Sequence, residues 1–397
     1  MFPRHVVEPA LKDGTFVKPV WSEEAARKLL VGAGPFVLDT IEPKRGIALV
    51  RNERYYLKDD AGRRLPYLDG VSFSRVESPD EAQVLFLTGE LDAAEVRAGD
   101  TERMIELAEE MGFSLLRRGP SGSDANLVFN LNPRTDEHHR AYVSPHLLTL
   151  FADVRFRRAV SLAIDRKAIA QTVYKGHVSI EGLPERDLDA AGELLDAMGL
   201  DERNAAGVRI DAERRPVSFM LLVFEDHPVG SVVVPRVAAD LKAIGLDVTV
   251  HAKPPRDWIR TRVQRWDWES TFLYLPSHPV GHPLFKQRGV WHSWGWGHVW
   301  NPRAKEAKAP YAWETAIDGK VAAARNAFEP DARDRLYREV VHVAREMAVV
   351  IPLFRPRRMT AVASRFGNLK PTLHRRYDIR YIFDTRVKDA AEAGLTR

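Results

Sequence analysis

Apolar positions recur at two different spacings along the chain, and together they predict alternating strands and helices. Residues 217–224 form a continuous apolar run, which is typical of a strand buried on both faces. Apolar residues then follow at helical spacing over 234–244, and a second strand comes at 248–250. A helix over 256–266 and a strand over 271–275 repeat this order. We therefore predict a mostly parallel sheet with helices on its faces and right-handed crossovers.

Helix-boundary signals outside this region predict further helices. Ser78 precedes Pro79, and Glu81 follows at the spacing of a capping box, so a helix is expected from here to Gly89. Asp153 and Asp165 stand where the N-caps of two consecutive helices are expected. Other helices are predicted over 100–111, 188–199 and 336–347, and other strands over 91–96, 126–131 and 348–354. The chain is thus predicted to belong to the α/β class throughout.

Composition sets the size and class of the protein. The chain has 397 residues, of which 45% are hydrophobic and 29% charged, so two or three domains with real cores are expected. It contains no apolar run long enough for a membrane span and, as given, no basic-then-apolar secretory signal at its start. Cysteine is absent, which excludes disulfides, thiolate zinc sites and cysteine nucleophiles.

The charge pattern argues against a nucleic-acid partner. Lysine and arginine total 59 against 55 acidic residues, a net charge of +4. Arginine pairs such as those at 63–64, 157–158 and 357–358 are spread among acids, whereas nucleic-acid binders concentrate positive charge in one stripe. We predict no nucleic-acid binding.

Several segments, in a fixed order, resemble one known family. The strongest match is Phe129-Asn130-Leu131-Asn132, followed by 153–166 with the sequence DVRFRRAVSLAIDR. Supporting matches lie at 32–36, 50–56, 66–71 and 89–93. The pattern resembles the bacterial extracellular solute-binding proteins of family 5, which serve ABC importers of peptides and related solutes. The resemblance extends, with gaps, from about Phe2 to about Phe383.

The resemblance implies a two-lobed periplasmic-binding-protein-like fold of type II, in the peptide-binding cluster. The first lobe would comprise 1–128 and 358–397, and the second 129–357, with crossing strands at about 127–132 and 355–363. A ligand would close the two lobes by a hinge motion. Because residues 1–8 resemble an internal stretch of the family, the first lobe is expected to be incomplete.

Candidate ligand-binding residues come from three segments. Residues 291–300 hold four of the nine tryptophans among glycines, namely Trp291, Trp294, Trp296 and Trp300, and such aromatics form stacking platforms; the alternative is a plug at the base of the second lobe. Asn130 and Asn132, on the proposed crossing strand, are placed to bond a ligand or equally to cap backbone. Glu225 and Asp226 end a parallel strand, where ligands bind in open α/β sheets, although a solvated loop is the simpler alternative.

Other chemistries lack support in the sequence. Proline at 279 and 283 prevents a helical metal site at His278 and His282, and no H-E-x-x-H, G-x-S-x-G or nucleotide-binding loop occurs. We predict no metal, no cofactor and no catalytic residue. Peptide-binding relatives resemble one another in having an aspartate shortly after the strand equivalent to 271–275. Residues 276–283 lack an acid, which favours an oligosaccharide or another stacked solute.

The predicted function is the substrate-binding component of an ABC importer, not an enzyme, that binds an oligopeptide, an oligosaccharide or a similar solute. Its partners would be the solute and the permease, with membrane contact only through the permease. By resemblance it would be periplasmic or extracellular, although the chain as given would be cytoplasmic. The alternatives are a cytoplasmic ligand sensor of the same fold and, third, a hydrolase using Asp226 or Glu225 with a histidine.

Overall fold

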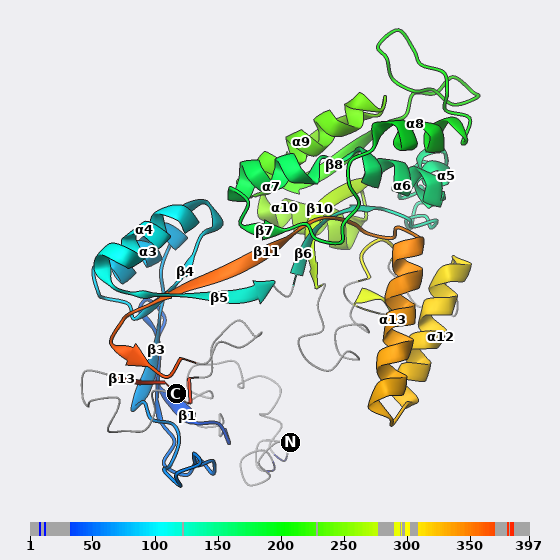
Figure 1. Ribbon diagram of the computed structural model, residues 1–397. Coiled ribbons are helices and arrows are strands. Elements are labelled where there is room, and N and C mark those ends of the chain that lie inside the picture. The colour runs from blue at the N-terminus through cyan, green and yellow to red at the C-terminus, as the bar shows by residue number, and fades with distance from the viewer. Residues whose placement is uncertain are drawn as a thin grey trace. The chain divides into compact units, whose positions relative to one another are not determined.

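The computed structural model describes residues 8, 12, 32–120, 123–227, 229–276, 290–293, 295, 298–301, 309–369, 379–380 and 382–384. The chain forms two compact units (Figure 1). The first comprises Met1–Arg118 and Arg358–Arg397, and the second Gly119–Arg357. The first boundary, at 118/119, comes earlier in the chain than the predicted one at 128/129.

The first unit contains a small antiparallel sheet in the order β1-β2-β3. Its strands are β1 (Phe36–Glu42), β2 (Gly46–Arg51) and β3 (Gly70–Ser74). Gly46 begins β2 with φ at 134°, and a Cβ there would lie 1.9 Å from the Phe73 carbonyl oxygen. Only glycine fits this approach, which brings β2 and β3 together.

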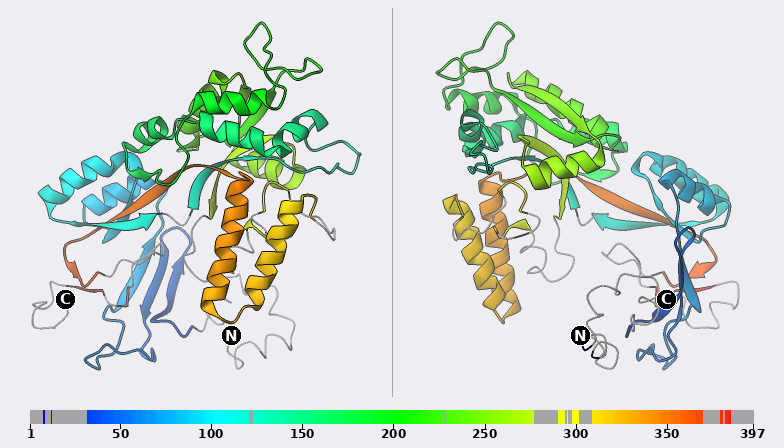
Figure 2. Two further views of the ribbon diagram at one scale, coloured as in Figure 1. Left: turned by 45° about the vertical axis from the view of Figure 1, so that its right-hand side comes forward. Right: turned by 180° about the vertical axis from the view of Figure 1, so that it is seen from behind.

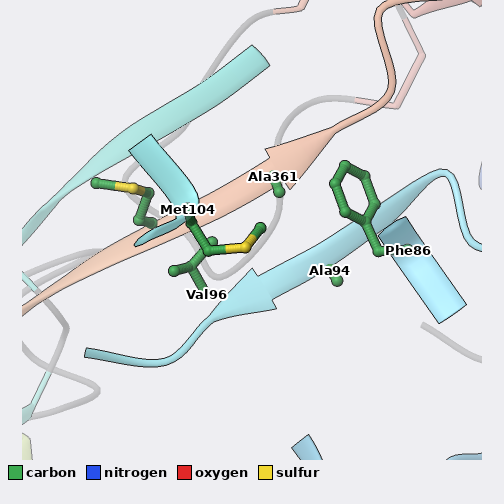
Figure 3. Packing of buried hydrophobic residues seen from close by; sticks show 6 residues of the cluster. Phe86, Ala94, Val96, Met104 and Ala361 are labelled. Carbon is green, nitrogen blue, oxygen red and sulfur yellow. The ribbon is translucent and has the colours of Figure 1, made fainter. Parts of the chain in front are cut away.

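Two helices cover a second layer of strands in the first unit (Figures 1 and 3). The elements are α3 (Pro79–Leu87), β4 (Ala93–Val96), the 3₁₀ turn Ala98–Asp100, α4 (Thr101–Met111) and β5 (Ser114–Pro120). The strands β12 (Phe366–Gly367) and β13 (Phe383–Asp384) form a separate two-stranded sheet. The strand β4 pairs antiparallel with the end of β11 (Ile351–Val362). Phe86 of α3 and Met104 of α4 pack over Ala94, Val96 and Ala361. This cluster is the core of the layer.

The predicted N-terminus of α3 is confirmed, with one change in its cap. The Ser78 hydroxyl accepts a hydrogen bond from the Glu81 amide at 3.1 Å. The Glu81 carboxylate reaches one residue further back than a capping box requires and accepts from the Glu77 amide at 2.6 Å. Both bonds satisfy amides that the first turn leaves without helical partners.

The second unit is built on a mixed sheet in the order β11-β6-β10-β8-β9. Its strands are β6 (Ser123–Phe129), β7 (Val178–Ser179), β8 (Ser218–Phe224), β9 (Asp247–Lys253) and β10 (Ser270–Pro276), with the first part of β11. The pairs β8–β9 and β8–β10 are parallel, as expected of strands joined by helices. The pairs β10–β6, β11–β6 and β11–β7 are antiparallel, so the expectation of a mostly parallel sheet holds only for β8, β9 and β10.

The helices of the second unit follow the predicted order. They are α5 (Pro145–Ala152), α6 (Val154–Ala163), α7 (Arg166–Tyr174), α8 (Leu188–Asp196), α9 (Gly230–Ala243), α10 (Pro255–Ile259), α12 (Ala312–Asn326) and α13 (Pro330–Glu346). Figure 2 shows α12 and α13 side by side as a hairpin. The helix predicted over 256–266 is instead a short α10 followed by a π-helical turn at Arg260–Arg265. A π-helical turn is rare and often lies at a functional site.

Two buried arginines of the 153–166 segment have structural roles. Arg157 is 1% exposed and donates to the carbonyl oxygens of Phe151 and Met347. Arg166 donates to the carbonyl oxygens of Ser161 and Pro352. Burial lowers the pKa of each guanidinium to about 10. These side chains tie α6 and α7 to the start of β11, so they serve the fold of the second unit.

Candidate functional site

The asparagines of the predicted crossing strand lie just beyond the end of β6. Asn130 is fully buried, and its Nδ2 donates to the carbonyl oxygens of Trp268 at 2.8 Å and Trp266 at 3.2 Å. Its Oδ1 accepts from the amide of Asn132 at 3.1 Å, and the Oδ1 of Asn132 accepts from the Arg134 amide at 3.2 Å. Both side chains therefore bond backbone, which is the capping role that the sequence left open.

The tryptophan segment is anchored beside these asparagines. The Leu131 amide donates to the Trp300 carbonyl oxygen at 2.7 Å. Trp300 is fully buried, and the ring of Trp291 lies 5.9 Å from it, centre to centre. Trp291 is partly buried and packs against the core between α12 and α13. Trp294 and Trp296 lie outside the described residues.

A buried carboxylate that the sequence analysis missed organises this segment. Glu314, in the first turn of α12, is 1% exposed. Its carboxylate accepts from Trp300 Nε1 at 3.0 Å and from Asn301 Nδ2 at 3.1 Å, and it lies 3.1 Å from His298 Nε2. The sequence held no clear signal for this role, because an acid in the first turn of a helix is usually an exposed N-terminal charge.

Glu225 and Asp226 lie at the other end of the same sheet. Both side chains are exposed and directly follow the buried strand β8. Asp226 has φ at 54°, a left-handed conformation that aspartate adopts more readily than most residues. The Glu225 amide donates to the Lys253 carbonyl oxygen at 2.8 Å, so the ends of β8 and β9 remain side by side.

The register of the strands separates these two groups. Phe129 and Leu221 both pair with Ser270, on either side of β10. From this level β6 runs on to Asn130, whereas β8 runs in the opposite direction to Glu225 four residues later. At about 3.3 Å per residue, the two levels are about 16 Å apart along the strands. The six sequence-predicted residues that the structure describes are therefore not brought into one compact site.

A cluster of aromatic rings packs around the carboxyl end of β8. The ring of His227 lies 4.3 Å from that of Phe224, 5.2 Å from that of Phe272 and, stacked, 6.0 Å from that of Tyr274. The Trp258 ring lies 5.8 Å from that of Phe224. His227 and Phe272 are buried, whereas Phe224, Tyr274 and Trp258 are partly exposed, so this aromatic cluster reaches solvent beside the two exposed acids through the last three rings.

The His227 side chain also accepts hydrogen bonds at the start of α9. Its Nδ1 accepts from the amides of Val229 at 3.1 Å and Gly230 at 2.8 Å, so in the neutral ring the proton is on Nε2. Burial lowers the pKa of this imidazole. A Cβ on Gly230 would lie 2.8 Å from a methyl group of Val223 and 3.0 Å from His227, so the helix start needs glycine here.

A bidentate ion pair joins β6 and β11 at the carboxyl edge of the sheet. Arg355 Nε lies 2.9 Å from Asp124 Oδ1, and its Nη2 lies 3.2 Å from Oδ2. Asp124 opens β6, and Arg355 is part of β11. The chain enters the second unit shortly before Asp124 and leaves it shortly after Arg355. Exposed acids, aromatic rings and both chain connections thus occur at the carboxyl edge of this unit.

Within the described ranges, no group of histidines and acids is arranged to hold a metal ion. His278 and His282 lie outside those ranges. None of the helices in the described part of the chain combines the length and the apolar character that a membrane span needs.

The fold and these segments define a class, the solute-binding proteins. The family model for bacterial extracellular solute-binding proteins, family 5 (middle region), matches residues 3–283. The chain belongs to this family, as its sequence motifs predicted.

Individual relatives are distant. A probable ABC transporter-binding protein of Deinococcus radiodurans is 23% identical over 63% of this chain and 45% of its own length. A periplasmic alpha-galactoside-binding protein of Rhizobium meliloti is 26% identical over 55% of this chain and 35% of its own. The chain thus spans less than half the length of these two relatives.

A solved structure confirms the predicted fold class. The oligopeptide-binding protein AppA of Bacillus subtilis, solved with a nonapeptide, matches 97% of this chain and 72% of its own with a TM-score of 0.65. The two sequences are 18% identical, so this likeness concerns the fold.

Proposed function

We propose that this protein is the solute-binding component of an ABC importer and that it holds its solute at the carboxyl edge of β8, β9 and β10. Membership of family 5 supports the importer role, as does the description of a relative as an ABC transporter-binding protein. The permease would be its partner and the cell exterior or periplasm its location. It would bind rather than transform its ligand.

The observation that carries this proposal is the pair of exposed acids beside an aromatic surface. In open α/β sheets, ligands bind beyond the carboxyl ends of parallel strands. Glu225 and Asp226 offer four carboxylate oxygens to hydroxyl or amine donors, and the partly exposed rings of Tyr274 and Trp258 offer apolar area to a sugar ring or an apolar side chain. Relatives described as binding alpha-galactosides and oligopeptides support these two ligand classes.

Charge-neutral variants test the acids directly. We expect Glu225→Gln and Asp226→Asn each to weaken solute binding about 10-fold, because a hydrogen bond to a charged group contributes about 1.5–3 kcal/mol. Isothermal titration with raffinose and tri-alanine as probes measures this. Glu193→Gln is the matched control, because Glu193 is an exposed acid of α8, and Arg209 joins the end of that helix to Ile244, before the start of β9. Unchanged binding in both variants, or no binding of either probe by the wild type, contradicts the proposal.

The same samples separate a binding protein from the hydrolase alternative. We expect each probe to be recovered chemically unchanged after long incubation, as judged by mass spectrometry. Fragments that form in the wild type and are absent with Asp226→Asn would favour an enzyme.

A further inference from the structure

Trp258 of helix α10 and Arg262 of the π-helical turn after it stack on each other. The guanidinium carbon of Arg262 lies 4.7 Å from the centre of the Trp258 ring. Trp258 in turn contacts Phe224, the last residue of β8. Trp258 therefore lies beside the end of β8, which Glu225 and Asp226 follow in the chain, and Arg262 stacks on Trp258.

Two donors of this pair have no acceptor. Trp258 Nε1 and Arg262 Nε are both buried and make no hydrogen bond within the described part of the chain. Buried donors in native proteins are nearly always paired, so an unpaired donor requires an explanation. Here two occur on side chains that stack on each other. Burial also lowers the pKa of Arg262, and no acid opposes this effect.

The surrounding segment lacks anions. Residues 253–265 contain five cations and one acid, Asp257. None of these five cations forms an ion pair with any residue that the structure describes. Arg262 forms no ion pair with Asp257, the acid of its own segment, within the described part of the chain. The segment 253–265 therefore carries more positive than negative charge.

The backbone beneath the pair is nevertheless firmly held. Trp268 Nε1 donates to the Arg262 carbonyl oxygen at 3.2 Å, and Lys253 Nζ lies 3.2 Å from the hydroxyl of buried Thr261. The π-helical turn is thus fixed on both sides while the Arg262 side chain lacks a polar partner. A rigid backbone with unpaired donors is what a preformed binding site requires.

We propose that Arg262 and Trp258 bind a carboxylate carried by the solute. The planar guanidinium fork matches a carboxylate, and the indole N–H supplies a further donor. The inference rests on the proposed function and narrows its solute to one bearing a carboxylate, either the C-terminus of a peptide or the acid of a uronic sugar. The lack of an acid at 276–283, together with the tryptophans, favoured an oligosaccharide or another stacked solute, and this inference adds that such a solute carries a carboxylate.

Paired probes test the preference and identify the source of the carboxylate. Titrations compare tri-alanine with tri-alanine amide, and trigalacturonate with galactotriose, against wild type, Arg262→Gln and Arg265→Gln. Arg265 is an exposed arginine three residues from Arg262. Arg265→Gln therefore removes the same charge and serves as the matched control. We expect the acid form of one pair to bind at least 10-fold more tightly than its neutral form, and only Arg262→Gln to abolish this preference. Equal binding within the pair that binds, or equal effects of the two variants, overturns the inference.

A direct readout separates this inference from the proposed function. Protein labelled with ¹⁵N-tryptophan is titrated with sodium acetate, and the Trp258 indole resonance is assigned with Trp258→Phe. We expect a saturable shift in wild type and Arg265→Gln and none in Arg262→Gln. Absence of a saturable shift in the wild type overturns the carboxylate site. If acetate shifts the resonance but no peptide or sugar probe binds, the carboxylate site is supported and the proposed solute-binding function is contradicted.

Discussion

The two ends of the sheet in the second unit differ in whether their polar groups are all paired within the protein. At the end marked by Asn130, the buried donors and the Glu314 carboxylate are matched to one another or to backbone. At the carboxyl edge, the Arg355–Asp124 pair and His227 are also satisfied, but Glu225 and Asp226 are exposed. Beside the end of β8, Trp258 and Arg262 stack on each other, and each holds a buried donor that has no acceptor in the described part of the chain.

This difference separates residues that stabilise the fold from residues available to a ligand. A satisfied buried network rigidifies a protein, whereas a donor left unpaired costs stability until something binds it. Substitutions at the first end should therefore reduce the free energy of unfolding. Substitutions of Glu225, Asp226 and Arg262 should change binding and leave stability largely intact.

The largest effect is expected at Glu314. We expect Glu314→Gln to lower the free energy of unfolding by about 3 kcal/mol, because removing one partner of a buried charged network leaves the others uncompensated. Urea unfolding followed by tryptophan fluorescence measures this, since eight of the nine tryptophans lie in the second unit. The exposed Glu181→Gln should change stability by less than about 0.5 kcal/mol. Equal stability of the two variants would contradict a structural role for Glu314.

A substitution at Asn130 should lower the free energy of unfolding by a smaller amount. Asn130→Ala leaves two buried carbonyl oxygens and one amide without their side-chain partner, and we expect a loss of about 2 kcal/mol. Asn326→Ala, at the exposed end of α12, is the control. If Asn130→Ala instead preserves stability and abolishes solute binding, the first end of the sheet is the binding end.

His227 should make stability depend on pH. Burial holds its folded-state pKa below the ordinary value of about 6.5, so the unfolded chain takes up the proton first as pH falls. This contribution is therefore complete above about pH 6.5 and is lost as pH falls from there toward the folded-state pKa. His227→Asn keeps an oxygen acceptor for the amides of Val229 and Gly230 but does not titrate. Unfolding curves between pH 7.5 and 5 should converge for the two proteins, and parallel curves would show that His227 does not titrate this way.

The smallest effect on stability is expected at Arg262. Arg262→Gln removes a partly buried cation that has no anion, so the free energy of unfolding should stay within about 0.5 kcal/mol of the wild type or rise. The same urea experiment measures it beside Glu314→Gln. A loss comparable to that of Glu314→Gln would mean that Arg262 supports the fold.

Much of the fold follows from local sequence signals. The apolar run before Phe224, the helical spacing up to Ala243 and the N-cap at Ser78 each predicted an element that the structure contains. The antiparallel pairing of β6 and β11 was not predicted, because strand direction depends on where distant segments return to the sheet.

The candidate site was only partly predictable for a related reason. Glu225 and Asp226 follow a recognisable buried strand, so their position at its carboxyl end could be derived. Trp300 was proposed from a cluster of tryptophans among glycines and Asn130 from its place on a proposed crossing strand. Whether such a side chain contacts a ligand or a buried partner depends on tertiary contacts. Glu314 and Arg262 are ordinary helix residues in the sequence, and only their burial distinguishes them.

One spectrum tests the contrast between the two ends most directly. Tryptophan indoles report on both, because Trp300 donates to Glu314 and Trp258 belongs to the carboxyl edge. Protein labelled with ¹⁵N-tryptophan is titrated with tri-alanine and, separately, with trigalacturonate, using Trp258→Phe and Trp300→Phe for assignment. The account predicts that at least one probe shifts the Trp258 resonance and leaves that of Trp300 in place. A shift at Trp300 with none at Trp258 would contradict it.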